Sequence, residues 1–309
     1  MKVCRSFVVF AVCVFLGQSG DAWGAETFRV ATYNLENYLD HGGSGRRLKS
    51  EAAKAKIREA IQALNADVIA LQEMGLPSAL EELRRSLQAE GLHYPHWEHV
   101  RGWDTNIHVA VLSRFPIVAR RSHTNDSFLL TGRRFHVSRG FAEVDIQVSP
   151  TYRFTLFTAH LKSKRPLASA DEAEMRLEEA KLLRAKVDAR LAADPRANIV
   201  VVGDLNDTKD SRPVRALIGT GRSKLVDTRP AEQNGDTITA ANPTWDPPHI
   251  TWTHFYGKED TYSRLDYILL NQDMAREWVR SGTYVLTLPN WALGSDHRPI
   301  VAEFIAEDK

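Results

Sequence analysis

Carboxylate, amide and imidazole side chains recur where the apolar, strand-like segments of this sequence end. Charged groups seldom lie against fully apolar strands unless they are paired or bind an ion, because an isolated buried charge is costly. If the strands run side by side, their ends meet at one edge and the polar groups share a cleft. The set consists of Asn34, Glu36, Glu73, His160, Asp204, Asn206, Arg264, Asp266, Asp296 and His297.

The donor types in this set favour a hard divalent cation. Carboxylate and amide oxygens bind Mg²⁺, Mn²⁺ or Ca²⁺, whereas structural zinc sites depend on thiolates. The 2 cysteines of the sequence, Cys4 and Cys13, lie far from the set. Magnesium keeps positions open for water and phosphate oxygens, and a nearby histidine can deprotonate water or stabilise developing charge. The set therefore predicts metal-assisted hydrolysis of a phosphate ester.

Helical and strand-like sequence patterns alternate along the chain, and these elements must position the polar residues. Apolar residues at helical spacing predict helices at residues 51–64, 77–87 and 169–192. The polar stretch 230–248 is long for a loop within a compact domain, and we interpret it as an elaborated surface loop of a single domain. Short runs rich in β-branched residues predict strands at residues 28–35, 67–73, 108–113, 141–148, 154–160, 199–203, 265–270, 284–288 and 299–305.

The first 24 residues have the three-part pattern of a secretory signal peptide. Lys2 and Arg5 precede the apolar run 7–16, and small residues follow it. This run is shorter than the stretch of about 20 apolar residues that a permanent membrane anchor needs. We therefore predict cleavage near Ala25, a secreted or periplasmic location, and one domain spanning residues 25–309 without disulfides. An uncleaved anchor is the alternative.

The composition excludes several classes of protein. Of the 309 residues, 43% are hydrophobic, which is too many for a disordered chain. The 40 Lys+Arg and 39 Asp+Glu nearly cancel, so any affinity for nucleic acid must come from a local patch. Basic side chains close to the set could form such a patch or be ordinary solvated loop charge: Arg133, Arg134, Arg139, Lys162, Lys164 and Arg165. Four histidines fit no metal-binding spacing and are interpreted as surface or substrate-rim residues: His93, His96, His99 and His108.

Seven short motifs follow one another in order from Val30 to about Phe304. They are Tyr33-Asn34-Leu35-Glu36-Asn37, Leu71-Gln72-Glu73, Ala110-Val111-Leu112-Ser113-Arg114, Ala159-His160-Leu161-Lys162-Ser163, Gly203-Asp204-Leu205-Asn206-Asp207, Arg264-Leu265-Asp266-Tyr267 and Ser295-Asp296-His297-Arg298-Pro299. This ordered set resembles the motifs of the endonuclease/exonuclease/phosphatase superfamily, which includes pancreatic-type deoxyribonucleases, abasic-site endonucleases, sphingomyelinases and inositol-polyphosphate 5-phosphatases. The resemblance implies an α/β fold, a four-layer α-β-β-α sandwich of two mixed β-sheets packed face to face with helices outside.

Carried over residue by residue, the resemblance also implies a metal site. Glu73 is expected to be the main ligand, with Asn34 beside the ion. Glu36 is a further ligand candidate, and Asp296 is expected to contact the metal directly or through water. The implied cofactor is Mg²⁺, with Mn²⁺ or Ca²⁺ as possible substitutes.

The remaining motif residues receive catalytic roles from the resemblance. Asp204 and Asn206 are expected to orient the attacking water and the scissile phosphate. Asp266 is expected to polarise His297, and His160 to hydrogen-bond a phosphate oxygen or the leaving group. The deoxyribonuclease branch backs its first histidine with a glutamate, and no equivalent can be identified in this sequence.

The predicted function is an exported, metal-dependent phosphodiesterase in which water attacks the phosphate directly, with nuclease as the leading interpretation. Arg139 and Lys162 are the candidate substrate contacts. A phosphomonoesterase, a lipid phosphodiesterase of the phosphoinositide or sphingomyelin type, and an inactive binding module remain alternatives. The expected partner is a phosphodiester, nucleic acid rather than phospholipid, and we expect a monomer without a stable protein partner.

Overall fold

The computed structural model describes residues 26–42, 45–234 and 249–308. The predicted signal peptide, with both cysteines, lies outside the described residues, as does most of the predicted loop 230–248. Among the described helices, none has both the length and the apolar character needed to cross a membrane.

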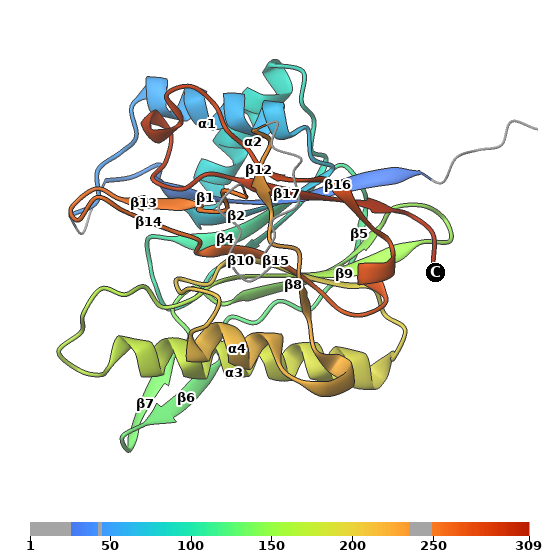
Figure 1. The fold of residues 1–309 in the computed structure, drawn as a ribbon. Coiled ribbons are helices and arrows are strands. Elements are labelled where there is room, and N and C mark those ends of the chain that lie inside the picture. The colour runs from blue at the N-terminus through green and yellow to red at the C-terminus, as the bar shows by residue number, and fades with distance from the viewer. Residues whose placement is uncertain (1–25, 43–44, 235–248, 309) are drawn as a thin grey trace, which may run out of the picture.

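Two mixed β-sheets packed face to face form the centre of the molecule (Figure 1). In the first sheet β1 runs parallel to β2 and antiparallel to β17. Its strands, in spatial order, are β12 (Ala231–Glu232), β16 (Trp278–Val285), β17 (Ile300–Ile305), β1 (Thr27–Tyr38), β2 (Val68–Met74), β4 (His108–Ser113) and β3 (His96–Val100).

In the second sheet β9 and β10 run parallel, and β15 pairs with β10 antiparallel. Its strands, in spatial order, are β11 (Val226–Asp227), β15 (Asp266–Leu270), β10 (Ile199–Asp204), β9 (Arg153–His160), β8 (Phe141–Gln147) and β5 (Ile117–Arg120). Two separate hairpins complete the described strands: β6 (Ser127–Leu130) with β7 (Arg133–His136), and β13 (His254–Tyr256) with β14 (Thr261–Ser263).

Helices cover the outer faces of both sheets, so the molecule has four layers (Figure 1). Helices α1 (Glu51–Leu64) and α2 (Pro77–Ala89) pack on the first sheet, and α3 (Glu172–Ala193) and α4 (Arg212–Ile218) on the second. Short 3₁₀ turns are η1 (Gly221–Ser223), η2 (Met274–Arg276) and η3 (Trp291–Leu293). This arrangement confirms the predicted α-β-β-α sandwich.

The apolar core between the sheets joins segments that are distant in sequence. Phe28 of the first sheet stacks on Phe154 of the second with ring centroids 5.2 Å apart. Along β1, Phe28 and Val30 face this inner core, whereas Ala31 and Tyr33 face the helices. This alternation is the period-two side-chain pattern of a strand with both faces covered.

Three local predictions were wrong. The strand predicted at 284–288 overlaps β16, which begins at Trp278 and ends at Val285. Its start was misplaced because its residues are mostly half-exposed and its pairing with β17 is irregular. The stretch 230–248 was predicted to be a loop, yet β12 lies at its start. His108 was predicted to lie at the surface but is fully buried in β4, and burial lowers its pKa to about 4.

Candidate active site

Alternation along the strands brings the predicted catalytic residues to one place. The inner-face series of β10 runs Val200, Val202 and then Asp204, so the polar residue follows directly after the apolar core. Asp204 is paired in register with His160 of β9 on one side and with Asp266 of β15 on the other. The same series of β1 continues to Asn34, which is buried. One end of the inter-sheet core is therefore lined with amide, carboxylate and imidazole groups.

The ends of β1 and β2 turn sharply where they carry predicted metal ligands. Glu36 and Glu73 have positive φ angles of 48° and 57°, and Asn37, next to Glu36 in sequence, has 62°. The β1–β2 register also shifts between Asn34 and Tyr38. The backbone amide of Asn37 donates to Oε2 of Glu73 at 3.0 Å. Non-glycine residues in this region are strained and concentrate at functional sites, because the surrounding structure must hold them there.

The predicted metal ligands form a group of neighbouring carboxylates. Burial raises the pKa of Glu36, and the nearby charges of Asp296 and Glu73 raise it further, while Lys49 opposes them from 3.4 Å. Asn34 contributes an amide whose Oδ1 accepts from the Glu36 amide at 3.0 Å. Carboxylate and amide oxygens gathered in this way fit a hard divalent cation, which would relieve their mutual repulsion.

Asp204 lies at the centre of the site. Its Oδ2 accepts from Nδ2 of Asn34 at 3.0 Å, and it lies 3.4 Å from Nε2 of His160 and 3.8 Å from Nε2 of His297. The carboxyl group is almost completely buried, and this burial raises its pKa to about 6 although His297 opposes the shift. A carboxylate with such a pKa can accept a proton near neutral pH.

Asn206 is positioned by the turn that follows β10. Its backbone amide donates to Oδ1 of Asp204 at 2.8 Å, and its side chain donates to the carbonyl of Leu161 at 3.0 Å. The turn depends on Gly203, whose φ is 135° and where a Cβ would lie 2.0 Å from the carbonyl oxygen of Ala159. Only glycine fits at this close approach between β9 and β10.

His297 is held in its charged form by carboxylates. Its Nδ1 lies 2.8 Å from Oδ2 of the buried Asp266. Burial alone would favour the neutral imidazole, but the charges of Asp266 and Asp204 outweigh it and raise the pKa of His297 well above its ordinary value. Ser295 fixes the loop, because its hydroxyl donates to the carbonyl of Asn34 at 2.7 Å and accepts from the His297 amide.

His160 is in the opposite state. Burial, and next the positive charge of Arg139, lower its pKa well below the ordinary value, so it is neutral at physiological pH. Its buried Nδ1 has no hydrogen-bond partner among the described residues, which agrees with the missing glutamate of the deoxyribonuclease branch. Its Nε2 faces Asp204 and lies 4.0 Å from Glu73. Two histidines with divergent pKa values are a typical acid–base arrangement.

The two predicted substrate contacts lie beside His160 in different ways. Arg139 is buried, and its Nη1 donates to the carbonyl of Leu161 at 3.2 Å. Nζ of Lys162 donates to the carbonyls of Ser163 and Arg165 at 3.1 and 3.2 Å, so its ammonium is held by its own loop. Both side chains contribute positive charge that lowers the pKa of His160.

Several residues of the site were missed by sequence reasoning. Glu179 of α3 is fully buried and accepts from the Lys162 amide at 2.6 Å and the Ser138 amide at 3.2 Å, which holds two site loops. A signal existed, because Glu179 falls at the helical spacing of the apolar stripe Met175 and Leu183. His254, 3.6 Å from Asp296, stands on hairpin β13–β14 and belongs to none of the seven motifs.

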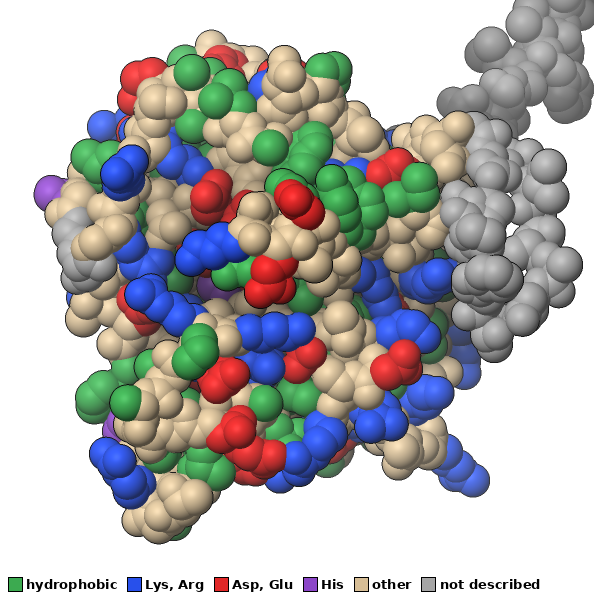
Figure 2. All heavy atoms as spheres, turned by 60° about the vertical axis from the view of Figure 1, so that its left-hand side comes forward, with side chains coloured by type: hydrophobic (Ala, Val, Ile, Leu, Met, Phe, Trp, Pro, Cys, Tyr) green, Lys and Arg blue, Asp and Glu red, His purple; other side chains and the backbone are tan. Residues whose placement is uncertain are grey.

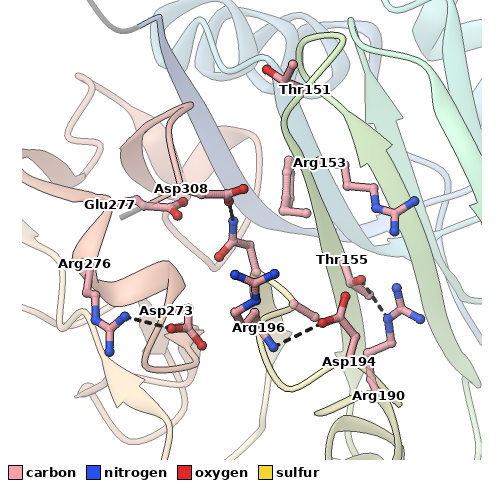
Figure 3. A pocket seen from close by; sticks show the side chains of 13 residues that line it. Thr151, Arg153, Thr155, Arg190, Asp194, Arg196, Asp273, Arg276, Glu277 and Asp308 are labelled. Atoms are coloured by element: carbon pink, nitrogen blue, oxygen red, sulfur yellow. Dashed lines mark hydrogen bonds and ion pairs between the residues drawn. The ribbon is translucent and has the colours of Figure 1, made fainter. Parts of the chain in front are cut away.

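Pockets lie at both ends of the sandwich. A pocket of about 600 Å³ adjoins Glu36 and is lined by four cations, Arg46, Arg47, Lys49 and Arg165, together with six other residues. In the view onto this end, lysine and arginine side chains gather across the middle of the face (Figure 2). The other pocket, of about 390 Å³, lies where β9 and β10 begin and contains none of the predicted site residues (Figure 3).

Several known proteins are similar to this chain. A model of the endonuclease/exonuclease/phosphatase family matches residues 31–297, a span that includes every predicted site residue. The human Nocturnin catalytic domain with bound sulfate is 16% identical at a TM-score of 0.62 and aligns over 90% of this chain and 94% of its own. Sphingomyelinase C from Streptomyces griseocarneus is 20% identical at a TM-score of 0.59, over 91% and 100%. Truncated Caenorhabditis elegans TDP2 is 17% identical at 0.57, over 91% and 98%. At these identities the structures share the fold, and no curated protein sequence matches the chain.

Proposed function

Because the chain belongs to the endonuclease/exonuclease/phosphatase family, we propose that it is an exported, magnesium-dependent phosphodiesterase that cleaves nucleic acid. The observation that supports this most is the meeting of three strands and the segment before β17 at one oxygen. Oδ2 of Asp204 lies within 3.8 Å of polar nitrogens from Asn34, His160 and His297. A buried carboxylate in this position, flanked by one neutral and one charged imidazole, suits the activation of water beside a phosphate.

Glu73, Glu36, Asn34 and Asp296 would hold the cation. When bound, Mg²⁺ lowers the pKa of water and neutralises charge on phosphate oxygens. Mn²⁺ or Ca²⁺ could occupy the same oxygen donors.

The chain's own residues divide the remaining work. Asn206 and Asp204 orient the attacking water, and Oδ2 of Asp204 accepts its proton. Charged His297 donates to a phosphate oxygen as negative charge accumulates, while Asp266 keeps the imidazole protonated. Neutral His160 hydrogen-bonds a second phosphate oxygen or the leaving group. The water attacks phosphorus directly, and no enzyme nucleophile is required.

Positive charge around the site supports a nucleic acid substrate. Arg139 and Lys162 flank His160, and burial followed by the Arg139 charge lowers the pKa of Lys162, as expected where cations crowd together. The pocket beside Glu36 adds Arg46 and Arg165. In a nucleic acid, the phosphates on both sides of the scissile bond would contact these basic side chains. A phosphomonoester has a single phosphate and would contact few of them.

A substrate panel tests this proposal. We expect cleavage of DNA or RNA in Mg²⁺, with little release of phosphate from monoesters and no hydrolysis of sphingomyelin or phosphoinositide. Rates should fall as salt rises, because the contacts to flanking phosphates are electrostatic. Hydrolysis of either lipid with nucleic acid left intact would replace the nuclease assignment with a lipid phosphodiesterase. Binding without turnover of any substrate would favour an inactive module.

Export rests on residues 1–24, whose pattern is that of a signal peptide. We expect the chain, expressed in a bacterium with its own leader, to accumulate outside the cytoplasm with a new N-terminus near Ala25. N-terminal sequencing of the recovered protein checks this expectation. Recovery of full-length chain from the cytoplasm would contradict it, without bearing on the activity.

A further inference from the structure

A second group of metal-binding atoms lies at the rim of the site. His254, Asp296 and His297 each offer one donor atom, and these three atoms lie within 4.8 Å of one another. Nε2 of His254 is 3.6 Å from Oδ2 of Asp296, and Nε2 of His297 is 3.9 Å from Oδ1 of the same carboxylate. Two imidazoles therefore flank one carboxylate. This donor set differs in kind from the oxygen donors of Glu36 and Glu73.

Backbone pairing keeps the two histidine side chains together. His254 of β13 and His297 form an antiparallel bridge, and their ring centroids lie 4.6 Å apart. On either side of this bridge, the Phe255 amide donates to the carbonyl of Asp296 at 3.0 Å, and the Arg298 amide donates to the carbonyl of Thr253 at 2.6 Å. Side chains opposite each other across such a pair point to the same face.

We propose that His254, Asp296 and His297 form an inhibitory Zn²⁺ site. Imidazole donors favour zinc over magnesium, and zinc binds to three protein ligands where its fourth position is left to water. Bond lengths of about 2.0–2.2 Å place the donors of a tetrahedral site about 3.4 Å apart. The separations of 3.6 and 3.9 Å, which involve the two different oxygens of Asp296, are close to this value, and the Asp296 side chain is 42% exposed.

The surroundings of His297 support zinc binding. Zinc-bound histidines usually donate their other ring nitrogen to a carboxylate, and Nδ1 of His297 already lies 2.8 Å from Asp266. This contact leaves Nε2 facing the site, 3.8 Å from Asp204 and 3.9 Å from Asp296. Zinc bound there replaces the proton on Nε2 of His297, which is released to solvent, so the imidazole can no longer donate to the phosphate and the Asp296 carboxylate can no longer support magnesium. The inhibitory role therefore rests on the proposed function, whereas the metal site does not.

Calorimetric titration with zinc chloride tests the site without any substrate. Wild-type protein should bind one Zn²⁺ that stays bound in excess Mg²⁺. His254→Ala should lower the affinity for zinc by at least about tenfold, because losing even a hydrogen-bond partner of a metal ligand costs that much. His41→Ala is the matched control, because His41 also lies beside a carboxylate, at 3.2 Å from Asp40, but is exposed and outside the group. Circular dichroism verifies that each variant is folded.

Activity in saturating Mg²⁺ tests the inhibition. Zinc should inhibit wild type and His41→Ala equally, while His254→Ala, measured relative to its own zinc-free rate, needs at least about tenfold more zinc for the same fractional inhibition. Equal zinc affinity in wild type and His254→Ala, or zinc that replaces magnesium in supporting turnover, would overturn the proposal. If no substrate is hydrolysed at all, the proposed function fails, and the calorimetric result still decides whether the zinc site exists.

Discussion

Replacing His297 with alanine is expected to lower kcat by about 10²–10⁴-fold, the usual contribution of a positioned proton donor. The structure gives the reason, because Asp266 and Asp204 keep this imidazole charged at the point where negative charge would develop on the phosphate. Single-turnover rates with a nucleic acid substrate measure the effect. A wild-type rate in the variant would contradict the catalytic role.

Folding must be separated from catalysis in this experiment, since His297→Ala leaves the buried carboxylate of Asp266 without its partner. Such a loss can destabilise a protein by about 3–5 kcal/mol. His297→Gln keeps an amide that can donate to Asp266, so it should fold with near-normal stability and still lose activity. Thermal unfolding followed by circular dichroism compares the two variants.

The variant Asp266→Asn tests the charge of His297 through the pH dependence of kcat/KM. Asp266 is the nearest charge that raises the pKa of His297, so kcat/KM of the wild type should persist as pH rises and fall only when His297 loses its proton. Without the Asp266 charge the pKa of His297 drops. The alkaline fall should therefore move to lower pH in Asp266→Asn. An unchanged alkaline limb would show that the charge of His297 is not required.

Removal of divalent cations is expected to abolish turnover, and added Mg²⁺ or Mn²⁺ to restore it. The expectation follows from the carboxylates of Glu36, Asp296 and Glu73, whose mutual repulsion a bound cation would relieve. Dialysis against chelator followed by back-titration of each metal measures the requirement. Undiminished activity in metal-free buffer would exclude the proposed chemistry.

Glu73→Gln makes the metal prediction specific to one residue. We expect at least about a 10–100-fold rise in the Mg²⁺ concentration needed for half-maximal activity, the range seen when even supporting partners of a metal are lost. Glu303→Gln is the matched control, because it removes the same charge away from the site. Glu303 pairs with Arg29 at 2.9 Å near the start of β1, whereas Glu73 lies where β2 ends. Equal magnesium requirements in the two variants would remove Glu73 from the metal site.

The residues of the site could be found from the sequence because strands alternate. An apolar series such as Val200 and Val202 predicts that the next inner-face residue, Asp204, closes the core, and the same logic applies to Asn34 and His160. The order of the motifs then indicated the family, and with it the four layers. The strand positions need only local spacing and the burial of apolar faces, whereas the four layers and the role of each residue came from the resemblance to the family.

Only the tertiary structure decided how these residues act on one another. Asn34 and Asp204 are 170 positions apart and hydrogen-bond only because two sheets pack face to face. Packing also made His160 neutral and His297 charged, although the two side chains are chemically identical, because a pKa depends on burial and on charges brought in by other elements. His254 shows the same limit: no spacing in the sequence connects it to His297, and a single backbone bridge between distant segments does.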